Sequence, residues 1–128
     1  MRVLLDTHAF LWFVWDDARL SIAARELMAD ASTDVYLSVA SAWEIAIKTS
    51  LNKLALAQPV REFVDEHLVR NSIRLLPIEL AHVAHVSAMP LHHRDPFDRL
   101  IAAQALIESV PLVSADQRHD PCGVERRW

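Results

Sequence analysis

The chain has 128 residues, 52% of them hydrophobic and 23% charged, which suits a single folded domain and excludes a disordered chain. Its one glycine, Gly123, excludes the glycine-rich phosphate loops of NAD enzymes and P-loop nucleotide hydrolases. The formal net charge of −4 argues against binding nucleic acid by bulk electrostatics alone, but leaves phosphate contact through a bound metal open.

Short apolar runs alternate with helix-like segments along the first half of the chain. The strands are rich in β-forming residues, and Ser21 is a suitable helix N-cap. In chain order we predict a strand at 3–5, a helix at 8–15, a helix from Ser21 to 31, a strand at 34–38 and a helix at 41–51.

The second half of the chain continues the alternation. We predict a helix from Pro59 to 70, a strand at 73–76, a helix at 79–89, a helix opened by Asp95-Pro96 and reaching 108, a strand at 112–114 and a last short strand at 124–128. Continuous apolar strands that alternate with helices indicate an α/β fold with a central parallel sheet covered by helices on both faces. Because no linker, repeat or low-complexity tract interrupts the pattern, residues 1–128 are predicted to form one domain.

Cysteine content and apolar run length bear on location. Cys122 is the one cysteine, so it forms no internal disulfide and no cysteine-based zinc cage, which favours a reducing cytosol. The longest purely apolar run, from Ala9 to Trp15, is far shorter than the roughly 20 residues that cross a bilayer. Asp6 and His8 interrupt the early apolar stretch, which argues against a signal peptide. We therefore expect a cytoplasmic protein with no membrane partner.

Four acidic residues stand where a parallel fold places functional sites. Asp6 directly follows the first strand, and Asp116 comes two residues after Ser114 at the end of another strand. Glu44 and Asp98 lie near the beginnings of apolar helices. Because strand ends and helix beginnings meet at the same edge of a parallel sheet, we expect all four carboxylates to converge.

Each of these acids also has a local structural explanation. A buried strand-end carboxylate such as Asp6 is the hardest to explain without a partner or a cation. The local alternatives are a capping box of Ser41 with Glu44, an ion pair of Glu44 with Lys48, an N-cap role for Asp95, a helix-dipole role for Asp98 and a turn at Asp116.

Clustered carboxylates point to a metal site. Like charges at close range raise one another's pKa unless a cation neutralises them. Hard oxygen ligands select Mg²⁺ or Mn²⁺, which favour phosphate substrates and activate water. This chemistry suits hydrolysis of a nucleic acid by an otherwise acidic protein.

Four segments together resemble a known family. They are residues 4–12 (LLDTHAFLW), 41–48 (SAWEIAIK), 95–105 (DPFDRLIAAQA) and 112–116 (LVSAD), in this order along nearly the whole chain. The chain resembles PIN-domain proteins and, more narrowly, the VapC-type toxins of bacterial type II toxin–antitoxin systems. The resemblance implies a PIN fold, Mg²⁺- or Mn²⁺-dependent endoribonuclease activity, a homodimer and inhibition by a cognate VapB-type antitoxin.

The resemblance also assigns residues. Asp6, Glu44, Asp98 and Asp116 occupy the family's four acidic positions. It favours Asp6 and Asp98 as direct metal ligands, while Glu44 and Asp116 act through waters or orient the attacking water. Two further residues, Ser114 and Asp95, lie next to these positions, Asp95 as a cap or a support for the ligands. His8 departs from the Asn or Ser often found two residues after the first aspartate.

Several other residues suggest contacts with RNA or metal. Basic side chains and histidines beside the acidic motifs either contact RNA phosphates or belong to a solvated loop; they are Lys48, Arg94, Arg99, His92 and His93. The pattern His82-x-x-His85 and the pair His92-His93 suggest zinc, but no third and fourth ligand stand at standard spacing. The aromatic residues Phe10, Trp12, Trp15 and Trp43 are expected to pack in the core or a dimer surface rather than to stack on bases.

Two other functions compete with a metal-dependent ribonuclease. A catalytically silent PIN domain that serves as a binding or scaffold module is disfavoured by the four intact acids. A phosphatase of the haloacid dehalogenase type needs a second aspartate two residues after Asp6, where this chain has His8.

Overall fold

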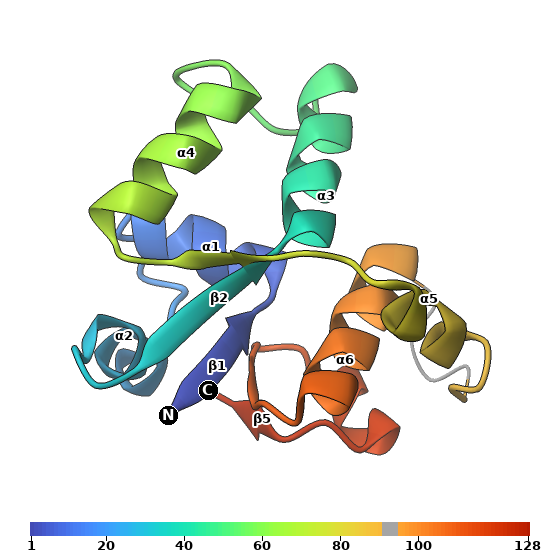
Figure 1. Cartoon of the computed structure of the whole chain (residues 1–128). Coiled ribbons are helices and arrows are strands. Elements are labelled where there is room, and N and C mark those ends of the chain that lie inside the picture. Colours follow the sequence, from blue (N-terminus) through green and yellow to red (C-terminus); the bar gives the residue numbers. More distant parts are fainter. Residues whose placement is uncertain (91–94) are drawn as a thin grey trace.

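A parallel sheet lies at the centre of the computed structural model, which describes residues 1–90 and 95–128 (Figure 1). Within these residues the sheet has five strands in the order β3-β2-β1-β4-β5. They are β1 (Arg2–Leu5), β2 (Asp34–Ser38), β3 (Arg74–Leu76), β4 (Leu112–Val113) and β5 (Arg126–Arg127). Leu5 of β1 pairs with Leu37 on one side and Val113 on the other, all in parallel register. The predicted parallel α/β sheet is therefore confirmed.

Helices connect the strands. They are α1 (Thr7–Val14), α2 (Ile22–Ala29), α3 (Val39–Ser50), α4 (Val60–Arg70), α5 (Leu80–Val86) and α6 (Pro96–Glu108), with a 3₁₀ helix, η1 (Gln117–Cys122), before β5. Two predicted caps are confirmed, since Ser21 accepts a hydrogen bond from the backbone N–H of Ala24 and Asp95 accepts from those of Phe97 and Asp98.

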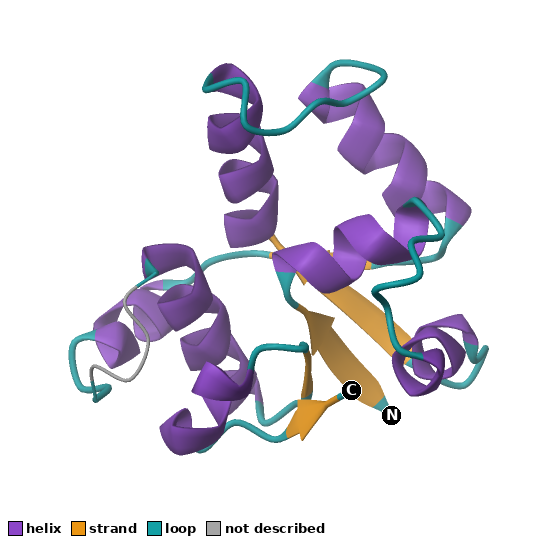
Figure 2. Ribbon diagram, turned by 180° about the vertical axis from the view of Figure 1, so that it is seen from behind, coloured by secondary structure: helices purple, strands orange, loops and turns teal. Residues whose placement is uncertain are grey.

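The sheet is covered on both faces because neighbouring residues of its strands point to opposite sides. Val3 and Leu5 pack in a cluster with residues of α1, α2 and α4. Leu4, which lies between them, packs in a second cluster with residues of α5 and α6. The two views of the molecule show these helix groups on opposite sides of the strands (Figures 1 and 2). All three leucine and valine side chains are fully buried, so β1 is the centre of the fold.

Two local predictions are corrected. The helix expected at 41–51 begins at Val39, because Ser38 caps it by accepting from the backbone N–H of Ala40. Ser41 is therefore buried inside α3 and forms no capping box with Glu44. Sequence reasoning also missed η1, whose Pro121 and short length give no helical periodicity.

The carboxyl ends of β1, β2 and β4 lead directly into the beginnings of α1, α3 and η1. This edge, together with the N-terminus of α6, is where the four acidic motifs stand. In the part of the chain that the structure describes, no helix is both long and apolar enough to cross a bilayer.

Candidate metal-dependent active site

Asp6 links the end of β1 to the start of α1. Its carboxylate caps the helix by accepting a hydrogen bond of 2.7 Å from the backbone N–H of Ala9. Only 6% of the residue is exposed, and this burial raises the pKa of Asp6, while hydrogen bonds from Ser114 and Ala9 oppose the rise. Asp116 raises the pKa of Asp6 further, so the two strand-end aspartates interact as predicted.

Glu44 is held in place by two donors. The Thr7 hydroxyl donates to one carboxylate oxygen at 2.6 Å, and the Lys48 ammonium donates to the other at 2.7 Å. The Ser41 hydroxyl lies 3.0 Å from that of Thr7. The predicted pair of Glu44 with Lys48 is confirmed, but Glu44 points toward the residue that follows Asp6 and not toward its own helix terminus. Thr7 was not foreseen, since only its position beside Asp6 marks it.

Asp98 lies in the first turn of α6, one turn beyond the Asp95 cap. The pKa of Asp98 is raised to about 7, mainly by burial and in addition by four other carboxylates. In decreasing order of effect these are Asp95, Glu44, Asp6 and Asp116. Asp98 therefore interacts electrostatically with every other acid that the sequence analysis singled out. This coupling indicates that the acids share one edge of the sheet.

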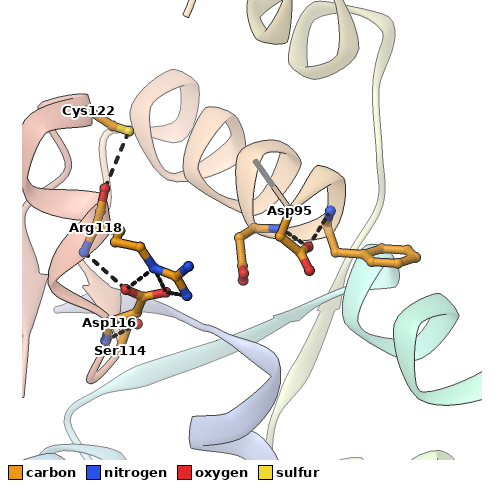
Figure 3. A network of polar contacts seen from close by, with 7 residues as sticks. Asp95, Ser114, Asp116, Arg118 and Cys122 are labelled. Atoms are coloured by element: carbon orange, nitrogen blue, oxygen red, sulfur yellow. Dashed lines mark hydrogen bonds and ion pairs between the residues drawn. The ribbon is translucent and has the colours of Figure 1, made fainter. Parts of the chain in front are cut away.

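Asp116 caps η1 and forms an ion pair with Arg118 (Figure 3). The guanidinium contacts both carboxylate oxygens at 2.8 to 3.2 Å, and the backbone N–H of Asp116 donates to the buried Ser114 hydroxyl at 3.0 Å. Asp116 raises the pKa of Arg118 most, and Asp98 and Asp95 add to the rise. Arg118 was also missed at the level of sequence, because its partner becomes apparent only in the 3₁₀ turn.

The chemistry of this edge suits a hard divalent cation. Its donors are carboxylate oxygens, the ligands that Mg²⁺ and Mn²⁺ prefer, and the high pKa of Asp98 reflects accumulated negative charge that a cation would offset. Within residues 1–90 and 95–128, no three acidic, histidine or cysteine side chains already stand close enough together to hold an ion.

The predicted RNA contacts have different surroundings. Lys48 is paired with Glu44, and the Arg99 guanidinium donates to the Val86 carbonyl at 2.9 Å. His92, His93 and Arg94 lie outside the described residues. A role for these five residues in RNA binding stays a prediction.

His82, the first histidine of the pattern in α5, has a structural role. One ring nitrogen of His82 accepts from the backbone N–H of Glu79, and the other lies 3.3 Å from the Glu108 carboxylate. Because both ring nitrogens of His82 already have partners, neither is available to bind zinc.

The aromatic residues divide into two groups. Phe10 is fully buried and Trp12 is half-buried against Trp128, as expected for core packing. Trp15 and Trp43 are 41% and 56% exposed, so they are surface side chains and not core. Trp43 makes an edge contact with Phe97 at the start of α6, with ring centroids 4.9 Å apart.

Comparisons with known proteins agree with this arrangement. The model of the PIN domain family matches residues 3–121. Ribonuclease VapC22 of Mycobacterium tuberculosis is 31% identical over 117 residues, which cover 91% of this chain and 88% of the relative. The fold is similar to that in the structure of VapBC2 from Rickettsia felis bound to a promoter DNA fragment (TM-score 0.74, 15% identity, 99% of this chain and 98% of that chain). It is also similar to VapBC-1 from nontypeable Haemophilus influenzae (TM-score 0.65, 15% identity, 99% and 97% coverage).

Proposed function

The chain belongs to the PIN domain family, and from this premise we propose that it is the toxin of a type II toxin–antitoxin system. Its activity is that of an endoribonuclease that depends on Mg²⁺ or Mn²⁺ and hydrolyses RNA phosphodiester bonds. The relative from Mycobacterium tuberculosis, which matches this chain over most of its length, is named a ribonuclease. Two structural neighbours are VapBC complexes. A cognate antitoxin of the VapB type holds the enzyme inactive in this proposal.

The observation that carries the proposal is the pKa of about 7 at Asp98, raised by burial and then by four other carboxylates. Five acids at one edge repel one another, which destabilises the folded chain, and a bound divalent cation would offset that repulsion. In this position, a carboxylate cluster at the carboxyl ends of parallel strands supports a metal-dependent active site.

Asp6 and Asp98 are the proposed direct ligands, with Glu44 and Asp116 acting through waters. When bound, the divalent ion neutralises charge on the phosphodiester and lowers the pKa of the attacking water. Asp6 is fixed for this role by the Ala9 N–H and the Ser114 hydroxyl. Glu44 is oriented by Thr7 and Lys48, so a water held at Glu44 would keep a constant position.

The helix caps give the site its rigidity. Asp95 fixes the first turn of α6 and so sets the direction in which Asp98 projects. Ser114 is completely buried and accepts from the Asp116 backbone, which ties the end of β4 to the carboxylates on either side of it. These supports keep the acids in place without metal, at the cost of their repulsion.

Cleavage of single-stranded RNA by the purified chain tests the proposal. We expect activity with Mg²⁺ or Mn²⁺, none with EDTA, and a loss of more than about 100-fold in Asp6→Asn and Asp98→Asn. Asp65→Asn, an exposed aspartate on α4, is the matched control and should cleave normally. Metal-independent cleavage, or full activity in both site variants, would contradict the proposal. A folded chain that binds but never cleaves RNA would favour the silent module instead.

The proposal extends to partners and location. Exposed apolar side chains on α5, Leu80 and Val83, provide a surface for the homodimer, and Cys122 as the one cysteine suits the cytoplasm. Light scattering after gel filtration should give twice the mass of one 14.5 kDa chain. A monomeric mass at micromolar protein concentration would contradict the proposed homodimer but not the proposed ribonuclease activity.

A further inference from the structure

A buried polar network joins α6 to the sheet. The side chain of Gln104, which lies within α6, is completely buried, and so is Ser38, the last residue of β2. The Ser38 hydroxyl donates to the Gln104 amide oxygen at 2.5 Å, and the amide nitrogen of Gln104 donates to the Pro77 carbonyl at 3.2 Å. Because Pro77 directly follows β3, one side chain connects α6 to the ends of two neighbouring strands.

The network can fix the position of α6 along its own axis. Three of the buried residues beside Gln104 are alanines, namely Ala102, Ala103 and Ala105. Their short side chains form shallow ridges, which specify helix register less sharply than long ones do. A buried amide is satisfied only where its partners meet it, because a buried polar group without a partner is costly. Buried polar contacts are therefore a well-established means of selecting one register of a helix.

The network lies at the same edge of the sheet as the acidic site. Leu5 pairs with Leu37, so the next residues, Asp6 and Ser38, leave the sheet at the same level. Ser38 also caps α3, which continues directly from β2 and carries Glu44 (Figure 1). A hydrogen bond from Ser38 to α6 therefore ties α6 to the point from which two of the acids are positioned.

A second contact between α3 and α6 lies next to the carboxylates. The rings of Trp43 and Phe97 meet with centroids 4.9 Å apart, and these residues directly precede Glu44 and Asp98. Gln104 lies six residues after Asp98, which is about 9 Å further along the helix axis. The aromatic contact and the hydrogen bonds of Gln104 thus hold α6 on either side of Asp98.

We propose that Gln104 is a positioning residue of the site, because it holds α6 in one register against the end of β2 and so places Asp98 relative to Asp6. The inference rests on the proposed function, since it requires both aspartates to bind one cation. Metal ligands must lie within about 0.2 Å of their ideal distances, and a displacement of about 1 Å at a catalytic group lowers activity about 100-fold. If Gln104 only fills the core, its replacement will lower stability and nothing else.

The first test measures Mn²⁺ binding to the full chain by isothermal titration calorimetry, without RNA. Gln104→Met keeps the approximate size of the side chain but forms neither hydrogen bond, and it should weaken Mn²⁺ binding about 3- to 10-fold. Ile101→Val is the matched control, because Ile101 is equally buried in the same helix and takes no part in the network. This variant should unfold at a lower temperature but bind Mn²⁺ as the wild type does.

Ser38→Ala removes the same hydrogen bond from the other side, together with the cap of α3. Ser21→Ala removes only the cap of α2, where Ser21 accepts from the backbone N–H of Ala24. Comparing the two separates the loss of a cap from the loss of the contact with Gln104. Ser38→Ala should weaken Mn²⁺ binding about 3- to 10-fold and Ser21→Ala should leave it unchanged. Adding Gln104→Met to Ser38→Ala should weaken binding little further, because both substitutions break one bond.

The kinetics of RNA cleavage at saturating Mn²⁺ give a second measurement. Gln104→Met should lower kcat about 10-fold and leave KM for RNA unchanged, because a completely buried side chain does not contact substrate. Gln104→Glu is the conservative variant. Its neutral carboxyl group keeps an acceptor for Ser38 and a donor for Pro77, and burial favours the neutral form. At pH 6 this variant should recover most of the kcat of the wild type at the same pH.

Two results would overturn the positioning role. One is wild-type Mn²⁺ affinity and kcat in Gln104→Met. The other is an equal loss of Mn²⁺ affinity in Ile101→Val, which would make the effect one of stability. If Gln104→Met does not fold, equal Mn²⁺ affinities in Ser38→Ala and Ser21→Ala overturn the role instead.

The wild-type chain separates this role from the proposed function. If it neither binds Mn²⁺ nor cleaves RNA, the proposed function is wrong and the positioning role is wrong with it. If it does both and Gln104→Met behaves identically, only the role of Gln104 is contradicted.

Discussion

The acidic edge contains two kinds of carboxylate. Glu44 and Asp116 are each held by a cation, Lys48 and Arg118 respectively. Asp6 and Asp98 are governed by burial, which is the largest cause of the raised pKa of each. The difference shows that cations of the fold itself compensate Glu44 and Asp116, whereas burial raises the pKa of Asp6 and Asp98. The following predictions test this division, starting with the largest effect.

The two groups should differ most in catalysis. Asp98→Asn removes a proposed direct ligand and should lower RNA cleavage more than about 100-fold. Asp116→Asn removes a residue that is proposed to act through water, and should lower RNA cleavage about 10-fold. Initial rates with 5′-labelled RNA and Mn²⁺ measure both. Equal losses in the two variants would erase the functional distinction between the two kinds of carboxylate.

Metal should stabilise the fold through Asp6 and Asp98, the proposed direct ligands. At a Mn²⁺ concentration about ten times the dissociation constant, the wild-type chain should gain about 1.4 kcal/mol, or roughly 3–6 °C in melting temperature. Asp98→Asn should show less than half of this increase. Thermal unfolding followed by circular dichroism, with Ca²⁺ and EDTA as comparison conditions, gives the values. A variant that responds to Mn²⁺ as the wild type does would exclude Asp98 as a ligand.

Without metal, the same substitution should make the protein more stable. The pKa of Asp98 in the folded chain, about 7, lies above the ordinary value of 3.8, so its buried charge destabilises the fold fully above pH 7. The destabilisation fades as the pH falls from 7 toward 4, because the folded chain then binds the proton first. In EDTA at pH 8, Asp98→Asn should raise the free energy of unfolding by about 1–3 kcal/mol, and by less at pH 5.

Asp116→Asn is the counterpart of that experiment. It breaks a partly exposed ion pair with Arg118 and should lower the free energy of unfolding by at most about 1 kcal/mol. Opposite signs in the two variants would support the division between the two kinds of carboxylate. Urea unfolding at pH 8 in EDTA measures both, and a gain in stability in Asp116→Asn would speak against it.

The smallest expected effect concerns His67 on α4, outside the acidic edge. Burial is the main cause that lowers the pKa of His67, and its Nδ1 has no hydrogen-bond partner in the described part of the chain. The folded chain therefore prefers the neutral ring, and its contribution to stability is complete above pH 6.5 and falls as the pH drops below it. His67→Leu should flatten the dependence of the melting temperature between pH 7.5 and 5.5. If the melting temperature of His67→Leu varies with pH as that of the wild type does, groups other than His67 cause the pH dependence.

Local sequence signals predicted most of the fold. The strand at 34–38 and the Asp95 cap of α6 stand where the sequence placed them, because β-forming residues and an Asp-Pro pair act over a few residues. The start of α3 was wrong, since two serines compete for the cap and a tertiary contact decides between them. Ser41 meets Thr7, which is 34 residues away, and so Ser38 is left to cap the helix.

In the site, too, the features with a local sequence signal were predictable and those set by tertiary contacts were not. The acids were predictable because strand ends and helix starts share one edge of a parallel sheet, and the electrostatic coupling of Asp98 to the others agrees with that geometry. Thr7 and Arg118 were not, since a single threonine or arginine carries no local mark of its partner.

Three aspartates of the acidic edge also begin helices, since Asp6, Asp95 and Asp116 cap α1, α6 and η1. A descendant of this chain that lost its enzymatic role would still be under selection to keep them, because a lost cap lowers helix stability by about 1 kcal/mol. Glu44 lies in the middle of α3 and caps nothing. Among related chains, a preserved glutamate at that position is therefore the better sign of an active enzyme, because the three aspartates are needed for the fold as well.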